Sequence, residues 1–226
     1  ETTRSLRTAT AVVLNVTPDH MDRYESVGEY ASGKARIFQH CDAAVMNLDD
    51  PLVQAMTPRA PRVLTFTLRA DRGGDYYALH IGQDVALMHD GRQVIAMSEM
   101  RIAGLHNVAN ALAALAMCDA LQLPQEPCVQ ALREFPGLPH RSQWIADVRG
   151  VRYVNDSKGT NVGATLAAVA GMPGSLVLIA GGQGKGQDFA PLAAAFHGKV
   201  RHVVLMGQDA KVLAAALDGA ASIEFA

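Results

Sequence analysis

The sequence lacks the features that mark membrane, secreted and nucleic-acid-binding proteins. No apolar run reaches the roughly 18 residues that a membrane-spanning helix needs, and no secretory signal is visible. The 20 lysines and arginines nearly balance the 22 aspartates and glutamates, and no long basic run occurs. We therefore expect neither a nucleic-acid partner nor a membrane partner.

Cysteine is scarce as well. The three cysteines, Cys41, Cys118 and Cys128, form no CxxC pair and no metal-ligand spacing, which is typical of reduced thiols in a cytosolic protein. Cys118 lies within an apolar helical pattern, so we expect it to fill space in the core. The chain also lacks an initiator methionine, and its last residues read as a strand just begun. We therefore expect a fragment of a longer protein.

What the sequence does contain is the pattern of a packed α/β protein, because 49% of the residues are apolar and 19% are charged. Continuous apolar runs predict strands that are buried in a parallel sheet: 11–16, 43–50 and 62–67. Residues 75–100 alternate between apolar and polar, which predicts a small antiparallel meander. Three further segments have the pattern of helices: 27–40, 106–123 and 126–134.

A segment with two prolines and a glycine, "FPGLPHR" (135–141), is the best candidate for a linker. Beyond it the pattern changes. A hairpin is predicted about Arg149 and Gly150, followed by strands at 175–182 and 201–207 that alternate with helices at 161–171, 189–198 and 209–218. Such alternation is typical of a parallel sheet covered by helices, so we expect a second α/β domain.

In open α/β sheets, ligands bind at the carboxyl ends of strands, so the polar residues there are candidates. In "NVTPDHMDRY", His20 could ligate a metal or orient a substrate, or the segment is only a surface loop with Thr17 as a helix cap. The segment "GEYASGKA" (28–35) fits most of a phosphate-binding loop. However, Ala35 stands where a serine or threonine should hold magnesium. By pattern, Lys34 is therefore an ordinary helix lysine.

Two further candidates flank the linker. In "GLHNVANALAA" (104–114), Asn107 and Asn110 are three residues apart and share a helix face. Either one of them caps the helix, or the pair recognises a nucleotide. In "LPHRSQ", the planar guanidinium of Arg141 could clamp a phosphate, or Arg141 is a surface residue.

The last candidates lie in two turns of the second half. In "YVNDSKGTN", Lys158 and the start of helix 161–171 would attract an anion, with Thr160 or Asn161 as the helix cap. Asp156 would accept a hydrogen bond from a hydroxyl or hold the lysine. In "GGQGKGQDF" (181–189), glycines allow close approach of a ligand to the backbone near Lys185, or the segment is a flexible turn.

Taken together and in this order, "NVTPDHMDRY", "GLHNVANALAA", "GLPHR", "YVNDSKGTN" and "GGQGKGQDF" resemble the ATP-dependent Mur ligases over essentially the whole chain. The resemblance is strongest to the members that add D-glutamate. It implies a parallel-sheet, ATPase-type central domain over 1–137 that lacks its phosphate-binding loop. It also implies an incomplete Rossmann-like domain over 138–226 that binds the amino acid.

The resemblance also implies a role for each candidate residue. His20 would be a catalytic ligand of magnesium, and Lys34 would be a catalytic lysine that holds magnesium once carbamylated. The ATP contacts would be Asn107, Asn110, Arg141 and Asp156. The residues that bind the carboxylates of D-glutamate would be Lys158, Thr160 and Lys185.

The implied activity is ATP-dependent ligation of D-glutamate to UDP-N-acetylmuramoyl-L-alanine through an acyl phosphate, in peptidoglycan precursor synthesis. The cofactors would be ATP and Mg²⁺, and the enzyme would be a monomer in the bacterial cytoplasm. Another amino-acid-adding Mur ligase or a folylpolyglutamate synthase is the alternative, although these relatives carry other residues at the "NDSKGTN" turn. Without the phosphate-binding loop, this chain by itself would be a non-catalytic nucleotide-binding module.

Overall fold

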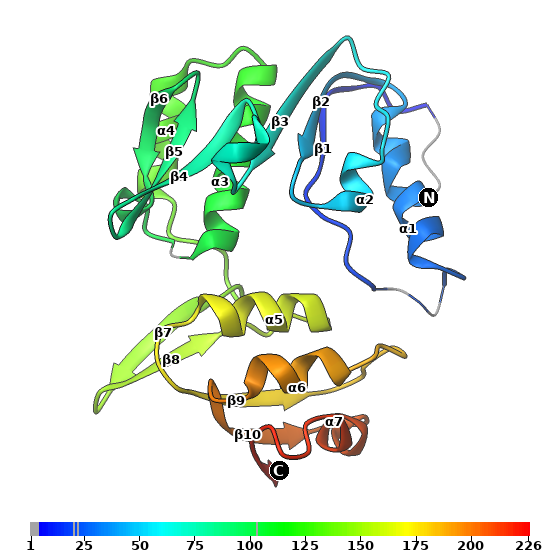
Figure 1. The fold of residues 1–226 in the computed structure, drawn as a ribbon, viewed down its shortest axis with the longest axis vertical. Coiled ribbons are helices and arrows are strands. Elements are labelled where there is room, and N and C mark those ends of the chain that lie inside the picture. The colour runs from blue at the N-terminus through cyan, green and yellow to red at the C-terminus, as the bar shows by residue number, and fades with distance from the viewer. Residues whose placement is uncertain (1–4, 20, 22, 103) are drawn as a thin grey trace. The chain divides into compact units, whose positions relative to one another are not determined.

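The computed structural model describes residues 5–226 except 20, 22 and 103. The chain divides into two compact units. The first comprises Glu1–Val16 and Ser26–Pro136, and the second comprises Thr17–Glu25 and Gly137–Ala226 (Figure 1). Within the described residues, no helix has both the length and the apolar character needed to cross a membrane.

The first unit is built on a six-stranded sheet whose strands follow one another in chain order. The first four strands are parallel: β1 (Thr8–Val13), β2 (Cys41–Asn47), β3 (Arg62–Thr67) and β4 (Tyr76–Ile81). The last two are antiparallel: β5 (Asp84–His89) and β6 (Arg92–Ala96). The predicted meander is therefore present, but it extends the main sheet through β4.

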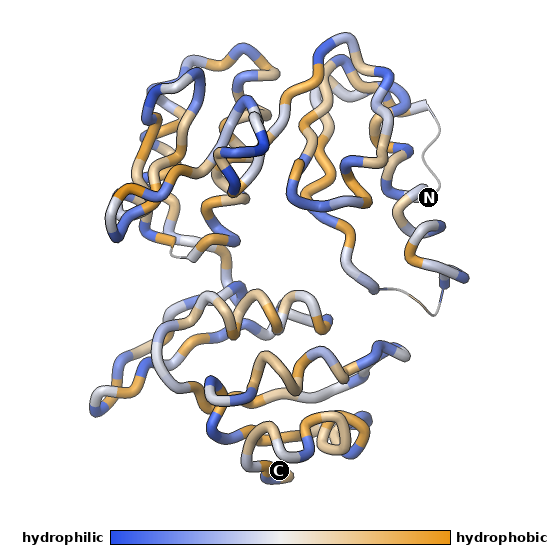
Figure 2. Tube along the Cα trace, viewed as in Figure 1, coloured by the Kyte–Doolittle hydropathy of each residue, from blue (hydrophilic) through white to orange (hydrophobic). Residues whose placement is uncertain are grey.

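Helices of the first unit pack against this sheet and build two hydrophobic cores. They are α1 (Val27–Ala35), α2 (Pro51–Gln54), α3 (Leu105–Ala120) and α4 (Gln125–Glu134), with 3-10 turns at Arg36–Phe38, Ala70–Arg72 and Met97–Glu99. Along β2, Val45 packs into the core of α3, whereas Ala44 and Met46 pack into the core of α1. This alternation is the two-residue period of a strand that is buried on both faces, and Figure 2 shows its apolar composition.

The start of α1 corrects one expectation and confirms another. The helix begins at Val27 with Ser26 as its cap, whose Oγ accepts a hydrogen bond from the Glu29 N–H at 3.1 Å. The expectation that Thr17 caps a helix is wrong. The Gly-x4-Gly-Lys pattern lies inside α1, so its rejection as a phosphate-binding loop is confirmed.

A tight turn joins α3 to α4. The Leu123 N–H donates to the Cys118 carbonyl at 3.0 Å, and the Gln122 N–H donates to the Asp119 carbonyl at 2.8 Å. This pair of hydrogen bonds is the Schellman motif, which places Gln122 in the left-handed region with φ 58°. Glycine usually occupies that position, because other residues are strained there by about 1 kcal/mol.

The strain at Gln122 leads to a stability prediction. Gln122→Gly is expected to raise the free energy of unfolding of the first unit by about 0.5 kcal/mol, the strain relieved minus the added entropy of the unfolded chain. Gln130→Gly, the same change inside α4, should lower that free energy by about 1 kcal/mol. Urea denaturation measures both variants, and a destabilised Gln122→Gly would contradict the account.

The second unit contains two separate sheets. One is the predicted hairpin, formed by β7 (Gln143–Val148) and β8 (Val151–Asn155), and its turn residues Arg149 and Gly150 both have positive φ. The other is a parallel sheet in the order β11–β10–β9, formed by Leu176–Gly181 (β9), Val200–Met206 (β10) and Ser222–Phe225 (β11). The turn after β8 therefore follows a hairpin strand and not a strand of the parallel sheet.

The helices of the second unit cover one face of its parallel sheet. They are α5 (Val162–Gly171), α6 (Ala190–Phe196) and α7 (Ala210–Ala216), and all three contribute to one core. Along β9, Leu178 and Ala180 face this core, whereas Val177 and Ile179 are 51% and 69% exposed. The sheet order follows the chain order, and crossovers between parallel strands share one preferred hand, so α6 and α7 are expected on the same face, as their common core shows.

Candidate functional site

The turn after β8 is joined to the segment that follows the linker. One Asp156 carboxylate oxygen accepts a hydrogen bond from the Ser142 N–H at 2.8 Å, and the Lys158 N–H donates to the His140 carbonyl at 3.1 Å. The hairpin brings these two segments together because it returns the chain to its starting point. As a result, Arg141 lies within a segment that is hydrogen-bonded to the turn of Asp156.

The start of α5 is partly occupied by groups of the protein itself. Asn161, and not Thr160, caps the helix, because its side chain accepts from the Ala164 N–H at 2.8 Å. The Val162 N–H donates to the side-chain oxygen of Gln187 at 2.9 Å. The helix start therefore offers fewer free N–H groups to an anion than the sequence suggested, and most of the positive charge there comes from lysines.

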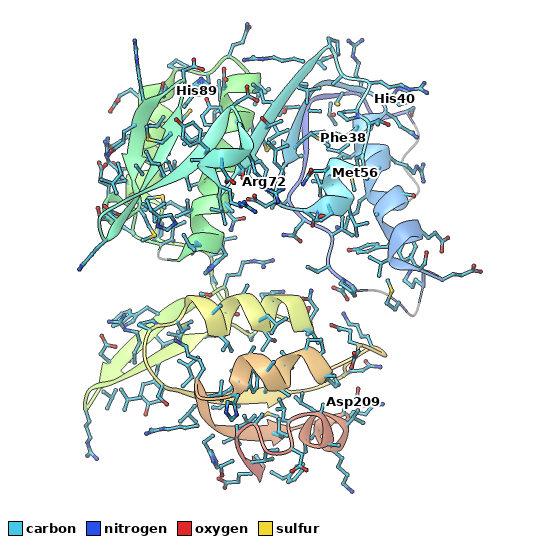
Figure 3. The ribbon with its side chains drawn as sticks, viewed as in Figure 1. Phe38, His40, Met56, Arg72, His89 and Asp209 are labelled. Atoms are coloured by element: carbon cyan, nitrogen blue, oxygen red, sulfur yellow. The ribbon has the colours of Figure 1, made fainter. Side chains whose placement is uncertain are left out.

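The glycine-rich turn after β9 is held in place by side chains. The Gly184 N–H donates to the Asp209 carboxylate at 2.6 Å, and Figure 3 labels Asp209 at the start of α7. Gln187 binds both the Gly184 carbonyl and the Val162 N–H, so it ties this turn to α5. Lys185 and Lys158 thus lie in two segments that adjoin the same helix start.

Asp19 is a residue that the sequence reasoning missed. Its carboxylate lies 3.9 Å from the Lys185 ammonium and accepts from the Asn161 side-chain amide at 3.4 Å. The Asp19 side chain is only 15% exposed. Asp19 belongs to "NVTPDHMDRY", the same motif as His20. Nothing in the sequence indicated that Asp19 lies near Lys185, because only folding brings these two segments together. His20 itself, with the metal role expected of it, lies outside the described residues.

Lys34 lies in the last turn of α1, with its ammonium 4.8 Å from the centre of the Tyr30 ring. This distance is within the range of a cation–π contact between the ammonium group and the ring. Residues 5–19, 21, 23–102 and 104–226 contain no group of three or more histidines, cysteines, aspartates or glutamates that could hold a metal ion. A magnesium ion would fit this part of the chain only with most of its ligands coming from phosphates and water.

The asparagines of α3 do not cap it, so that interpretation is wrong. Gly104 is the N-cap, with φ 97°, and no side chain caps the helix. Asn110 instead lines a cavity of about 520 Å³ between α3 and α4, whose other walls are largely apolar: Ile102, Ala111, Ala114, Leu115, Cys118, Leu123, Pro124, Pro127, Cys128, Ala131, Leu132 and Phe135. An apolar cavity with an amide at its wall suits a flat, partly polar ring.

The two α/β units of the chain each match a known protein family in sequence. A family model described as the Mur ligase middle domain matches residues 1–118, and a second one, described as the Mur ligase glutamate ligase domain, matches residues 140–226. The chain belongs to the Mur ligase family, which confirms the resemblance and the α/β fold class.

Individual relatives refine this result. The chain is 50% identical over 218 residues to a UDP-N-acetylmuramoylalanine--D-glutamate ligase of Methylobacillus flagellatus, which covers 96% of this chain and 48% of the relative. It is 48% identical over 223 residues to the enzyme of the same name from Hahella chejuensis, covering 97% of this chain and 50% of the relative. The chain thus spans about half the length of these curated relatives.

Solved structures share the fold at low sequence identity. A pseudomurein peptide ligase type C from Methanothermus fervidus matches with a TM-score of 0.78 at 15% identity, over 96% of this chain and 52% of that one. The MurF ligase of Thermotoga maritima, in complex with ADP, matches with a TM-score of 0.67 at 17% identity, over 96% and 57%. The mostly parallel α/β fold class is therefore confirmed.

Proposed function

We propose that the protein containing this sequence is an ATP-dependent ligase that joins D-glutamate to UDP-N-acetylmuramoyl-L-alanine in peptidoglycan precursor synthesis. The observation that carries the proposal is the start of α5, where two lysines, Lys158 and Lys185, adjoin one helix terminus. That arrangement suits an amino acid with two carboxylates. The names of the two relatives that are 48–50% identical support the same substrate.

Each unit has its own part in the proposal. In the proposed central domain (1–137), Asn107 and Asn110 bind the nucleotide. In the proposed amino-acid-binding domain (138–226), Arg141 and Asp156 contact ATP. The residues that hold the D-glutamate carboxylates are Lys158, Thr160 and Lys185. The ADP in the MurF relative supports a nucleotide in this fold.

The chemistry follows from the charges of the groups involved. The γ-phosphoryl group of ATP is transferred to the carboxylate of the muramoyl-alanine, which makes an acyl phosphate. The amine of D-glutamate then attacks the acyl carbon, and inorganic phosphate leaves from the tetrahedral intermediate. The lysines of the second unit orient the amino acid and offset its negative charge.

The remaining parts of the proposal concern the metal and the setting of the enzyme. Magnesium would neutralise phosphate charge, with His20 and a carbamylated Lys34 as the protein's contribution. Carbamylation would reverse the charge of Lys34 and end its contact with the Tyr30 ring. We also propose that the enzyme acts as a monomer in the bacterial cytoplasm.

Asp156→Asn tests the nucleotide site. The asparagine oxygen can still accept from the Ser142 N–H, so the turn should keep its structure, while the ribose hydroxyls lose a charged acceptor. The KM for ATP of the full-length enzyme is expected to rise roughly tenfold, a loss of about 1.4 kcal/mol, with little change in melting temperature. Asp147→Asn is the control, because Asp147 pairs with Arg152 on the same hairpin, and it should leave this KM unchanged.

Phosphate release tests the reaction itself. The full-length enzyme should release phosphate only when ATP, UDP-N-acetylmuramoyl-L-alanine and D-glutamate are all present. Residues 1–226 alone should release almost none, because they lack the phosphate-binding loop. Turnover of the full-length enzyme with a different amino acid, or with a folate in place of the muramoyl substrate, would contradict the proposed activity.

A further inference from the structure

Two cysteine thiols meet at the wall of the cavity between α3 and α4. Cys118 belongs to α3 and Cys128 to α4, and both line the cavity. The Cys118 and Cys128 thiols lie close enough to interact with each other, and the Cys128 thiol donates to the Pro124 carbonyl at 3.3 Å. Both residues are only half-buried, so Cys118 is not the core filler that its sequence context suggested.

The turn between the helices fixes the spacing of these thiols. The Cys118 carbonyl accepts from the Leu123 N–H within the Schellman motif, and Pro124 precedes the first residue of α4. The two cysteines are therefore held by a short, hydrogen-bonded connection and not by a flexible loop. The remaining cysteine, Cys41, is buried elsewhere, and its thiol donates to the Phe38 carbonyl at 3.5 Å.

We propose that Cys118 and Cys128 are a reversible thiol–disulfide pair, which a low-molecular-weight disulfide oxidises to a covalent link between α3 and α4. In the first step, the Cys128 sulfur attacks the small disulfide, forms a mixed disulfide and releases one small thiol. In the second step, the Cys118 sulfur attacks Cys128, forms the protein disulfide and releases the second small thiol. Each attacking thiol gives up one proton, and each departing sulfur takes one.

The environment of Cys118 sets the order of these steps. Burial, and after it the interaction with the Cys128 thiol, raises the pKa of Cys118 to about 11, so its thiol stays protonated at neutral pH. A protonated thiol is a poor first nucleophile, which favours Cys128 as the point of entry. Cys118 then acts within the molecule, where its nearness to Cys128 compensates for its low reactivity.

The disulfide would change the cavity. A disulfide holds its two sulfur atoms about 2.05 Å apart, closer than unbonded thiols can pack, so its formation would draw the two helices together. Asn110, Ala114 and Cys118 lie one helical turn apart along the same face of α3, and all three line the cavity. The oxidised cavity should therefore hold an adenine base less well, a consequence that rests on the proposed nucleotide role of Asn110.

The link can be detected without any activity assay. The folded chain is treated with glutathione disulfide, its free thiols are alkylated, and the unfolded product is cut by a protease that cleaves before aspartate. Asp119 directly follows Cys118, so cleavage there separates the two cysteines along the backbone. We expect the two fragments to remain joined, two hydrogens lighter than their sum, until reductant is added. Separate fragments that each carry glutathione or the alkylating group would overturn the pair.

Matched variants show which thiols react. In Cys118→Ser the treatment should stop at a glutathione adduct on Cys128, whereas Cys41→Ser should form the link as the unchanged chain does. A link that persists in either Cys118→Ser or Cys128→Ser would mean that Cys41 takes part, which would also overturn the proposal. These outcomes do not depend on whether the protein binds ATP.

A second measurement tests the consequence for the cavity. ADP affinity of the full-length protein is compared before and after oxidation, and we expect a roughly tenfold weaker Kd that reductant restores. An equal affinity in both states, with the link formed, would overturn the coupling but leave the thiol pair standing. Absence of ADP binding even in the reduced protein would instead contradict the proposed function.

Discussion

Replacing Gly181 with alanine is expected to unfold the second unit or to lower its free energy of unfolding by about 4 kcal/mol or more. Gly181 ends β9, and a Cβ atom there would lie 1.8 Å from the Met206 carbonyl oxygen and 2.8 Å from the Met206 carbonyl carbon. Both obstacles belong to the backbone of β10, so no side-chain rotation relieves the overlap. The two strands would have to separate, and with them the pairing of β9 and β10.

Gly182→Ala is the matched control for this prediction. Gly182 also has a positive φ, 103°, but a Cβ atom would meet nothing within 4 Å. Alanine there should cost only the backbone strain, about 1–2 kcal/mol. Guanidinium denaturation followed by circular dichroism measures both variants. Equal losses at the two positions would show that the close approach of β10 to Gly181 does not decide the stability.

Lys185→Met in the full-length enzyme is expected to lower kcat/KM for D-glutamate roughly 30- to 150-fold, which corresponds to about 2–3 kcal/mol. Methionine keeps the length of the apolar stem and removes the ammonium group, which is the group proposed to bind a substrate carboxylate. The distance of 3.9 Å to Asp19 is longer than a tight ion pair. The ammonium can therefore turn to a ligand at little cost.

The control is Lys211→Met, because Lys211 is an exposed lysine of α7 in the same unit. Lys211→Met removes the same charge from the surface and should change neither the KM for D-glutamate nor the KM for ATP. Steady-state kinetics with D-glutamate and ATP varied separately distinguish the roles. The loss in Lys185→Met should appear with D-glutamate, and an equal rise in the KM for ATP would contradict its assignment to the amino acid.

The extent of β1 shows what local patterns leave out. The apolar run predicted a strand at 11–16, but the strand is Thr8–Val13, whose residues Thr8 and Thr10 pair with Cys41 and Ala43 of β2. At the other end, the Val16 N–H donates to the Asp50 carboxylate at 2.7 Å instead of joining a strand. Both ends of β1 are set by partners more than thirty residues away along the chain. The composition of a short stretch of sequence carries no information about such partners. In contrast, β3 has the predicted bounds of 62–67, between a proline and a polar turn.

The candidate site also contains some residues that the sequence pattern identifies and others that only the fold brings together. Asp156 and Lys158 stand out in sequence because carboxylate and ammonium groups are dense in one short turn between a strand and a helix. The bridge made by Gln187 and the pairing of Asp19 with Lys185 do not stand out, because each joins segments that meet only in the folded chain. Their residue types are ordinary for loops, so no local signal distinguished them from surface polar residues.

The grouping of Thr17–Glu25 with the second unit has a practical consequence for dissecting the molecule. The polypeptide passes from one unit to the other three times, after Val16, after Glu25 and after Pro136. A single break at Pro136 would therefore free a piece that leaves Asp19 behind, and Lys185 would lose its acidic neighbour. A faithful isolated second unit would need residues 17–25 spliced back onto it.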